Sequence, residues 1–253
     1  METKPILVIG DTCRDIFVHC HCSRLCPEAP VPVLDIMREV QNLGMAGNVY
    51  ENIKALGYSV ELLANNNAHS ITKTRYVETK TNHMFIRIDV PVKPERIDLT
   101  NVDFNIYSAI VVSDYNKGFL GYEDLKLISN SHPLTFLDTK KTLGDWAKHF
   151  TFIKINRSEY AQSLPFISNE VESKIIVTLG EEGCRYQDKF FPVKQVEIKN
   201  LSGAGDTFLA ALTVKYVLTN DINSSLIFAN EAATLVVQKV GVGTCPELAL
   251  KKL

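Results

Sequence analysis

The first ninety residues carry short apolar runs and alternating apolar and polar positions, which are the patterns of β-strands. Residues 6–9 form a β-branched run that ends at Gly10, as a buried parallel strand would. One helix is predicted at 46–56, where apolar residues recur at helical spacing before Gly57. The other strands predicted in this part of the chain lie at 14–22, 31–40, 60–64, 72–79 and 83–89.

After Pro94 the pattern changes to strands that alternate with helices. Such alternation implies a parallel sheet with helices on both faces and right-handed connections. The strand-rich segments at 14–40 and 72–90 do not fit it, so we expect them to form a separate small sheet. The elements predicted after Pro94 are strands at 109–112, 134–137, 152–155 and 175–178, and helices at 121–131, 143–149, 204–218 and 222–240.

The composition is that of an ordinary globular protein, with 253 residues, 45% of them hydrophobic and 22% charged. A formal net charge of -2 gives no electrostatic attraction to nucleic acid or to anionic lipid, so neither is expected as a partner. No apolar run approaches the roughly 20 residues that span a bilayer, and the start of the chain lacks a signal-peptide pattern. We therefore expect a cytoplasmic protein with no membrane partner.

Four of the six cysteines lie between positions 13 and 26, close to two histidines. Metal ligation by His19, Cys20, His21 and Cys22 is one interpretation. Alternate residues of a strand point to opposite faces, so these four side chains do not converge on one ion. Free thiols on a β-strand are the preferred interpretation.

The strongest chemical signal is the sequence Gly203-Ala204-Gly205-Asp206 at the start of a long apolar helix. Small residues at a helix N-terminus let backbone N–H groups approach an anion, and the helix dipole favours negative charge there. A carboxylate at Asp206 can accept the proton of an attacking hydroxyl while the turn holds a phosphoryl group. The alternative is a tight turn in which Asp206 only caps the helix, and these residues alone do not separate the two.

This turn resembles the C-terminal signature of the ribokinase-like (PfkB) carbohydrate kinases, and further blocks similar to that family follow in order along nearly the whole chain. The resemblance implies a Rossmann-type three-layer α/β/α sandwich with a small β-sheet lid. It implies one kinase domain over 1–253, with lid strands inserted at 14–40 and 72–90. ATP would be the phosphoryl donor and Mg²⁺ the cofactor.

Three of these sequence blocks resemble family segments that act on the sugar and on the transferred phosphoryl group. The resemblance makes Asp206 the catalytic base. Asp15, which follows the first strand, would bind the acceptor. Asn48 would bind a sugar hydroxyl from a loop that resembles the family's glycine-rich loop and contains Gly44 and Gly47.

Other blocks correspond to the nucleotide. Asn156 and Glu159 resemble the family's Asn-x-x-Glu motif, whose acid acts on Mg²⁺ and phosphate through water. The further residues that the resemblance assigns to nucleotide binding are Thr178, Gly180, Gly183 and Asn230.

Within the family, residues 23–33 look like those of the kinases that phosphorylate D-glycero-D-manno-heptose 7-phosphate at C1, a block that generic sugar kinases lack. A phosphorylated sugar needs cations as well as groups that bind hydroxyls. Arg75, Arg87 and Lys117 lie in further blocks similar to these kinases and are the candidate phosphate partners. For each of them the alternative is a solvated surface charge.

The chain departs from the family in three places. Only residues 64–70 separate two predicted strands where the family has roughly 30 residues, the length of one βα unit, so the sheet should lose an edge element. Met45 stands where the sugar loop usually has glycine. Asn200 and Ser202 replace an aspartate–threonine pair that helps to hold a monovalent cation in many members, which makes such a cation doubtful.

No His-x-Gly-His sequence occurs, so nucleotidyl transfer is not expected.

The function expected from the sequence is ATP-dependent phosphorylation of heptose 7-phosphate, with the amides of Ala204 and Gly205 stabilising the transferred group. Two alternatives remain open. One is a kinase for another sugar or a nucleoside. The other is a kinase-like binding protein with little turnover, for which the missing segment argues. Apolar Val33, Leu34 and Ile36 on the lid predict a homodimer through that sheet.

Overall fold

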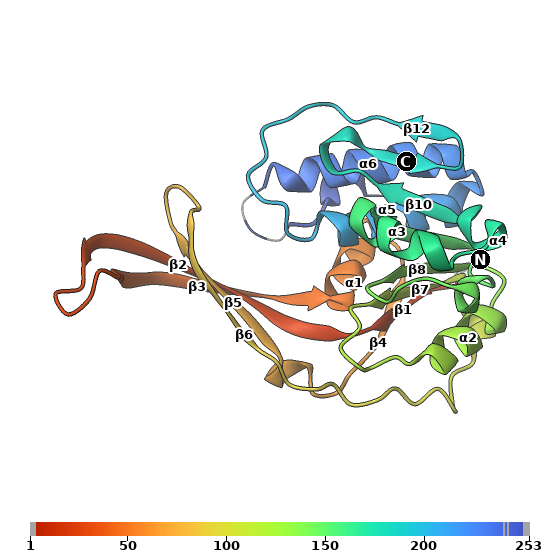
Figure 1. Ribbon diagram of the computed structural model, residues 1–253, viewed down its shortest axis with the longest axis horizontal. Coiled ribbons are helices and arrows are strands. Elements are labelled where there is room, and N and C mark those ends of the chain that lie inside the picture. Colours follow the sequence, from red (N-terminus) through yellow and green to blue (C-terminus); the bar gives the residue numbers. More distant parts are fainter. Residues whose placement is uncertain (1–3, 240, 242, 250–253) are drawn as a thin grey trace.

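The computed structural model describes residues 4–239, 241 and 243–249. It contains an eight-stranded sheet within an α/β body and a four-stranded sheet that projects from this body (Figure 1). The large sheet has the strand order β12-β11-β10-β9-β8-β7-β1-β4. Neighbours from β10 to β4 pair in parallel, and β11 and β12 add an antiparallel hairpin at one edge. The strands are β1 (Ile6–Gly10), β4 (Val60–Ala64), β7 (Ala109–Asp114), β8 (Thr135–Thr139), β9 (Phe152–Asn156), β10 (Ile175–Thr178), β11 (Cys184–Tyr186) and β12 (Lys189–Phe191).

Helices cover both faces of the large sheet, because its central strands are apolar on both sides. Ile6 and Val8 of β1 point into the core beneath α1, α5 and α6, whereas Leu7 and Ile9 point into the core that α2, α3 and α4 cover. This arrangement confirms the predicted α/β fold class. No helix in the described part of the chain is long and apolar enough to cross a membrane. The helices are α1 (Ala46–Ala55), α2 (Tyr122–Ser131), α3 (Arg157–Ser163), α4 (Asn169–Glu172), α5 (Ala204–Thr219) and α6 (Ile222–Val237).

The four-stranded sheet, called the small sheet below, consists of β2, β3, β5 and β6 in the order β3-β2-β5-β6. β2 and β5 pair in parallel, and the two outer pairs are antiparallel. β2 and β3 are longer than the strands predicted at 14–22 and 31–40, and their far ends extend well away from the body (Figure 1). The bounds are β2 (Thr12–Leu25), β3 (Pro32–Met45), β5 (Thr72–Glu78) and β6 (Met84–Val90).

The helix predicted at 143–149 is wrong. This segment contains only a 3₁₀ turn, η3 (Asp145–Ala147), because the extended backbone at Gly144 interrupts helical geometry. The helix predicted at 222–240 ends with α6 at Val237, and position 240 lies outside the described residues. The elements β11, β12, α3 and α4 are too short for apolar periodicity to indicate them. The remaining 3₁₀ turns are η1 (Ala68–Ser70), η2 (Phe104–Ile106), η4 (Leu164–Phe166), η5 (Gly180–Glu182) and η6 (Pro246–Leu248).

The short connection between β4 and β5 is held by asparagine side chains. β4 is an edge strand of the large sheet, and the chain passes from it directly into the small sheet. Asn65 accepts a hydrogen bond from the backbone N–H of Thr12 (2.8 Å) and donates to the side chain of Asn67 (3.0 Å). Asn67 donates to the backbone carbonyl of Lys93 (3.0 Å). These contacts tie the connection to the root of β2.

The His-Cys segment of β2 places its side chains on alternate faces, as expected for a strand. Cys20 packs with Ile16 and Val18 on one face, while His19 lines a cavity on the other. All six cysteines are free thiols.

Candidate active site

The turn that contains Gly203 begins α5. Gly203 is the N-cap residue and has a φ of 83°, a left-handed conformation that glycine adopts without strain. The chain therefore turns directly into the helix at Ala204 and Gly205, whose N–H groups have no acceptor within the helix, although that of Ala204 makes a long contact of 3.4 Å with the Leu201 carbonyl. The positive end of the helix dipole lies at the same point. This combination is the geometry of an anion-binding turn.

Asp206 lies in the first turn of α5 and is buried, with 6% of its surface exposed. Its Oδ2 accepts a hydrogen bond from Asn48 Nδ2 at 2.9 Å, and its Oδ1 accepts one from the Tyr115 hydroxyl at 2.8 Å. Burial raises the pKa of Asp206 to about 6, although both donors act to lower it. The carboxyl group is therefore ionised at neutral pH, with a pKa suited to a general base.

Two cavities meet at Asp206. Cavity A, about 540 Å³, lies between the turn, the ends of β9 and β10, and α6. Cavity B, about 450 Å³, lies between the turn, α1 and the root of the small sheet. Tyr115, Lys140, Gly203 and Asp206 line both cavities. A group transferred between ligands in A and B would pass the Asp206 carboxylate.

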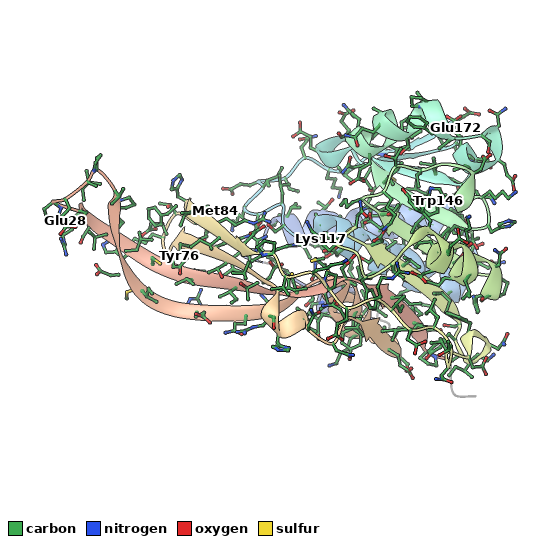
Figure 2. All side chains as sticks on the ribbon, turned by 60° about the horizontal axis from the view of Figure 1, so that its bottom comes forward. Glu28, Tyr76, Met84, Lys117, Trp146 and Glu172 are labelled. Atoms are coloured by element: carbon green, nitrogen blue, oxygen red, sulfur yellow. The ribbon has the colours of Figure 1, made fainter. Side chains whose placement is uncertain are left out.

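Cavity B has more cationic than acidic side chains among its described lining residues. Arg75 pairs with Asp15 at 2.7 Å, and both are largely buried. Arg87 makes two hydrogen bonds to Asp89, at 2.7 and 2.6 Å. Figure 2 shows Lys117 where the small sheet joins the body. The charged lining residues are Lys73, Arg75, Arg87, Lys117 and Lys140, with Asp15, Asp89 and Asp206.

Cavity A collects the residues that the sequence assigns to the nucleotide. Asn230 lies at its α6 wall and donates to the backbone carbonyl of Phe191 at 2.9 Å. Gly183 has a φ of 107°, and a Cβ there would lie 2.1 Å from the carbonyl oxygen of Phe191. Both residues therefore also hold β12 in place. The assigned residues that line cavity A are Asn156, Thr178, Gly180, Gly183 and Asn230.

Two lysine–carboxylate pairs lie beside the turn. Lys154 donates to Asp138 Oδ2 at 2.6 Å, and both side chains are almost completely buried. The Lys154 ammonium lies 2.9 Å from where a Cβ on Gly205 would stand, so it faces the anion-binding turn. Lys140 pairs with Glu159. Within the described part of the chain, Asp138 Oδ1 is buried without a hydrogen-bond partner.

Three assigned residues lie behind the cavity walls. Glu159 forms a capping box with Asn156 at the start of α3. A Cβ on Gly44 would lie 2.8 Å from the Asp15 carboxylate, and a Cβ on Gly47 would lie 2.6 Å from a neighbouring side chain. The two glycines thus permit the close packing that shapes cavity B.

The sequence of the chain matches a protein family over about half of its length and curated proteins over nearly all of it. Residues 125–249 match the family described as pfkB family carbohydrate kinase. The bifunctional protein HldE of Helicobacter pylori is 32% identical over 305 residues, covering 98% of this chain and 66% of that protein. HldE of Nitratiruptor sp. is 32% identical over 296 residues, covering 95% of this chain and 63% of that protein.

The chain contains a pfkB-family carbohydrate kinase domain. This family indicates a phosphotransferase that acts on a sugar hydroxyl. The chain spans about two thirds of the length of the curated relatives it matches. The match to H. pylori HldE extends over 305 residues, more than the 253 of the chain, so that relative carries additional residues inside the matched region.

Solved structures show that the kinase domain has the ribokinase fold. Arabidopsis thaliana ribokinase, complexed with ribose and ATP, has a TM-score of 0.68 at 16% identity, covering 99% of this chain and 98% of that one. The nucleoside kinase of Methanocaldococcus jannaschii has a TM-score of 0.67 at 17% identity, covering 95% of this chain and 93% of that one.

Several side chains that line the two cavities are not singled out by the sequence. Tyr115 lies within a block similar to heptose kinases and directly follows the buried strand β7, a position where ligands gather at the carboxyl edge of a parallel sheet. Lys154 lies on the buried strand β9, where its ammonium faces the turn. The further residues of this kind are Lys73, Asp89, Asp138 and Lys140.

Proposed function

We propose that this kinase domain transfers the γ-phosphoryl group of ATP to the C1 hydroxyl of D-glycero-D-manno-heptose 7-phosphate. The excess of cationic side chains in cavity B, beside Asp206, is the observation that carries the proposal. A neutral sugar needs partners for its hydroxyls, whereas a sugar phosphate also needs cations. Similarity to the HldE proteins, which suggests a heptose kinase, supports the same substrate.

The acceptor lies in cavity B in this proposal. Asp15 and Asn48 orient its hydroxyls, and Asp206 accepts the proton of the attacking one. A bond forms between the acceptor oxygen and the γ-phosphorus, and the bond from that phosphorus to the bridging oxygen breaks, which releases ADP. The N–H groups of Ala204 and Gly205 stabilise the charge on the transferred group.

ATP lies in cavity A, with its phosphates at the turn and its adenine toward Asn230. Lys140 and Lys154 face the phosphates. The unpartnered oxygen of Asp138 fits a Mg²⁺ ion, which usually binds through one or two carboxylates, water and phosphate oxygens, whereas Glu159 lies behind the cavity wall. Glu159 would act on this ion through water. When bound, the ion neutralises charge on the phosphates.

The small sheet is, in this proposal, a lid inserted in one kinase domain. It supplies Asp15, Lys73, Arg75 and Arg87 to cavity B, so the acceptor binds between the sheet and the body. Binding there excludes water from the carboxylate and the transferred group.

A panel of acceptors tests the proposed function. ADP release is measured with ATP and, in turn, heptose 7-phosphate, hexose 6-phosphates, unphosphorylated sugars and nucleosides. We expect kcat/KM for heptose 7-phosphate to exceed that for unphosphorylated heptose by about 100-fold or more, because the phosphate adds charge-assisted contacts with the cationic side chains of cavity B. A preference for unphosphorylated sugars would contradict the proposal. If the chain binds ATP but releases no ADP in the presence of any of these acceptors, the result would favour a binding protein.

A nucleoside is the second candidate acceptor. Cavity C, about 390 Å³, adjoins cavity B at Arg75 and Ser202. Phe17, Met84 and Leu201 give it apolar walls that suit a planar base. A higher kcat/KM for any nucleoside in the same panel would favour this function.

A further inference from the structure

The turn that follows β7 is fixed by its own hydrogen bonds. Asp114 Oδ1 accepts from the backbone N–H of Asn116 at 2.9 Å, and Asp11 Oδ2 accepts from the backbone N–H of Tyr115 at 2.8 Å. Asn116 has a φ of 55°, a left-handed conformation that asparagine tolerates better than most residues. Tyr115 is thus the central residue of a tight turn held at both of its flanking peptide groups.

The carboxylate that anchors this turn is itself immobilised. Asp114 Oδ2 accepts hydrogen bonds from Lys141 Nζ at 2.7 Å and from Thr139 Oγ1 at 2.6 Å, and the Asp114 and Lys141 side chains are buried. A buried charge pair with further hydrogen bonds fixes local geometry, because breaking it would leave a charge without a partner. The backbone at Tyr115 therefore has little freedom.

The ring of Tyr115 is fixed as well. It packs against a buried cluster of Cys13, Met45 and Ile71. Lys73 Nζ lies 5.2 Å from the ring centre and Lys140 Nζ lies 5.7 Å from it, within the range of cation–π contacts. These contacts direct the hydroxyl at the point where cavities A and B meet.

We infer that Tyr115 is a positioning residue for the catalytic base: its hydroxyl holds one oxygen of the Asp206 carboxylate, while Asn48 holds the other, so that the remaining lone pairs face the acceptor hydroxyl. The inference rests on the proposed phosphoryl transfer. The hydrogen bond of 2.8 Å is charge-assisted and partly buried, which makes it stronger than an exposed hydrogen bond between neutral groups.

This contact also has an electrostatic consequence. Burial and the nearby Asp206 carboxylate hold the pKa of Tyr115 well above its ordinary value, so the phenol stays a neutral donor. A donor to a carboxylate favours the ionised form and lowers the pKa of that carboxyl group. Loss of the hydroxyl therefore raises the pKa of Asp206. The other charged groups around the pair are Asp15, Lys73, Arg75, Arg87, Asp89, Lys117, Asp138, Lys140 and Lys154, and they are unchanged by a substitution of Tyr115.

Tyr115→Phe tests the inference, because it removes the hydroxyl and keeps the ring in its cluster. We expect the acid limb in the pH dependence of kcat/KM to shift to higher pH by about one unit. Activity at neutral pH should fall by about 10- to 100-fold, the worth of one hydrogen bond to a charged group, and recover partly at higher pH. Tyr122→Phe is the matched control, since Tyr122 is exposed and its ring contacts Trp146 outside both cavities. A Tyr115→Phe profile that coincides with that of the wild type would overturn the inference.

A second substitution reverses the effect. A fluorinated tyrosine at position 115 has a more acidic phenol and is a stronger donor, so the acid limb should move to lower pH. It keeps the hydroxyl and the packing, and thus answers the question if Tyr115→Phe fails to fold. An acid limb that stays in place would contradict the inference.

A direct titration separates this inference from the proposed function. The carboxyl of Asp206 is followed by carbon NMR in aspartate-labelled protein, with its signal assigned from Asp206→Asn. Its pKa should be higher in Tyr115→Phe even if none of the acceptors in the panel is phosphorylated. An unchanged pKa in an active enzyme would sink the role of Tyr115 and leave the kinase function standing.

Discussion

At Asp206, burial and hydrogen bonding act on one carboxyl group in opposite directions. Burial prevails and raises the pKa to about 6. Because only the ionised carboxylate accepts a proton, we predict that kcat/KM rises with pH through about 6 and then levels off. Steady-state kinetics at a series of pH values around 6 measure this acid limb of the pH profile. An acid limb near pH ~4, the ordinary range of an aspartate, would contradict the prediction.

A second prediction concerns the buried pair of Lys154 and Asp138. Lys154→Met leaves a buried carboxylate without its partner, which should lower the free energy of unfolding by about 3–5 kcal/mol. Adding Asp138→Asn should restore most of this loss, because neither member of the pair then carries a charge. Urea denaturation measures both. Lys126→Met is the control, since its exposed pair with Glu123 should contribute only about 0–1 kcal/mol. Equal losses in the single and the double variant would refute the account of this pair.

At the scale of single residues, the sequence identifies those site residues that stand next to one another in the chain. The turn at 203–206 can be read directly, because its small residues and its acid stand side by side. Tyr115 and Lys154 cannot be read in that way. The partner of Tyr115 is 91 positions away and that of Lys154 is 16 positions away, so each contact exists only once the strands are paired.

At the scale of elements, the hairpin β11–β12 depends on Gly183. A Cβ at Gly183 would collide with the Phe191 carbonyl, whereas a Cβ at Gly180, which also has positive φ, would meet no atom within 4 Å. We predict that Gly180→Ala costs about 1–2 kcal/mol of unfolding free energy, from backbone strain alone. Gly183→Ala should cost distinctly more and weaken ATP binding, since the hairpin borders cavity A. Chemical denaturation and ATP titration of the two variants measure this, and equal losses would contradict it.

Elements follow from the sequence where burial imposes a clear pattern. β1 and β10 are predicted to within one residue because each is apolar on both faces, whereas β7 continues past its predicted end through the polar residues Ser113 and Asp114. The helix predicted at 143–149 fails because the backbone is extended at Gly144, although the apolar residues of this segment still fill the core. The ends of β2 and β3 are not predictable, since the outer part of the small sheet has few buried residues.

At the scale of the whole molecule, the small sheet leaves one apolar face uncovered. Strand register places Ile36 opposite Cys20 and Ile86 opposite Tyr76, so both isoleucines share this face, and they are 65% and 51% exposed. We propose that a second copy of the chain covers the face. Figure 2 shows Tyr76 on the part of the sheet that projects from the body.

Charge on that face should prevent the assembly. Ile86→Glu should convert the dimer to a monomer in sedimentation experiments, because the carboxylate would have to be buried without a partner. Leu127→Glu alters an exposed residue of α2 in the body and should leave the dimer intact. A wild-type chain that sediments as a monomer would contradict the prediction.

The order of strands and helices along the chain predicts the large-scale arrangement of the molecule, but it does not predict the substrate. The alternation of strands and helices after Pro94 predicts the layered body, and the strand-rich start predicts the second sheet. The charge of cavity B emerges only when β2, β5 and β6 meet the turn of α5, because its residues come from separate parts of the chain.

A site built around Asp206 should transfer a phosphoryl group from ATP to a sugar phosphate. The most direct measurement incubates the chain with ATP, Mg²⁺ and heptose 7-phosphate and follows the product by phosphorus NMR, with Asp206→Asn alongside. We predict a second phosphate at C1, with turnover lower by about 10²–10⁴-fold in Asp206→Asn while ATP binding is retained. No phosphorylation of this acceptor, or equal turnover in the two proteins, would contradict the account.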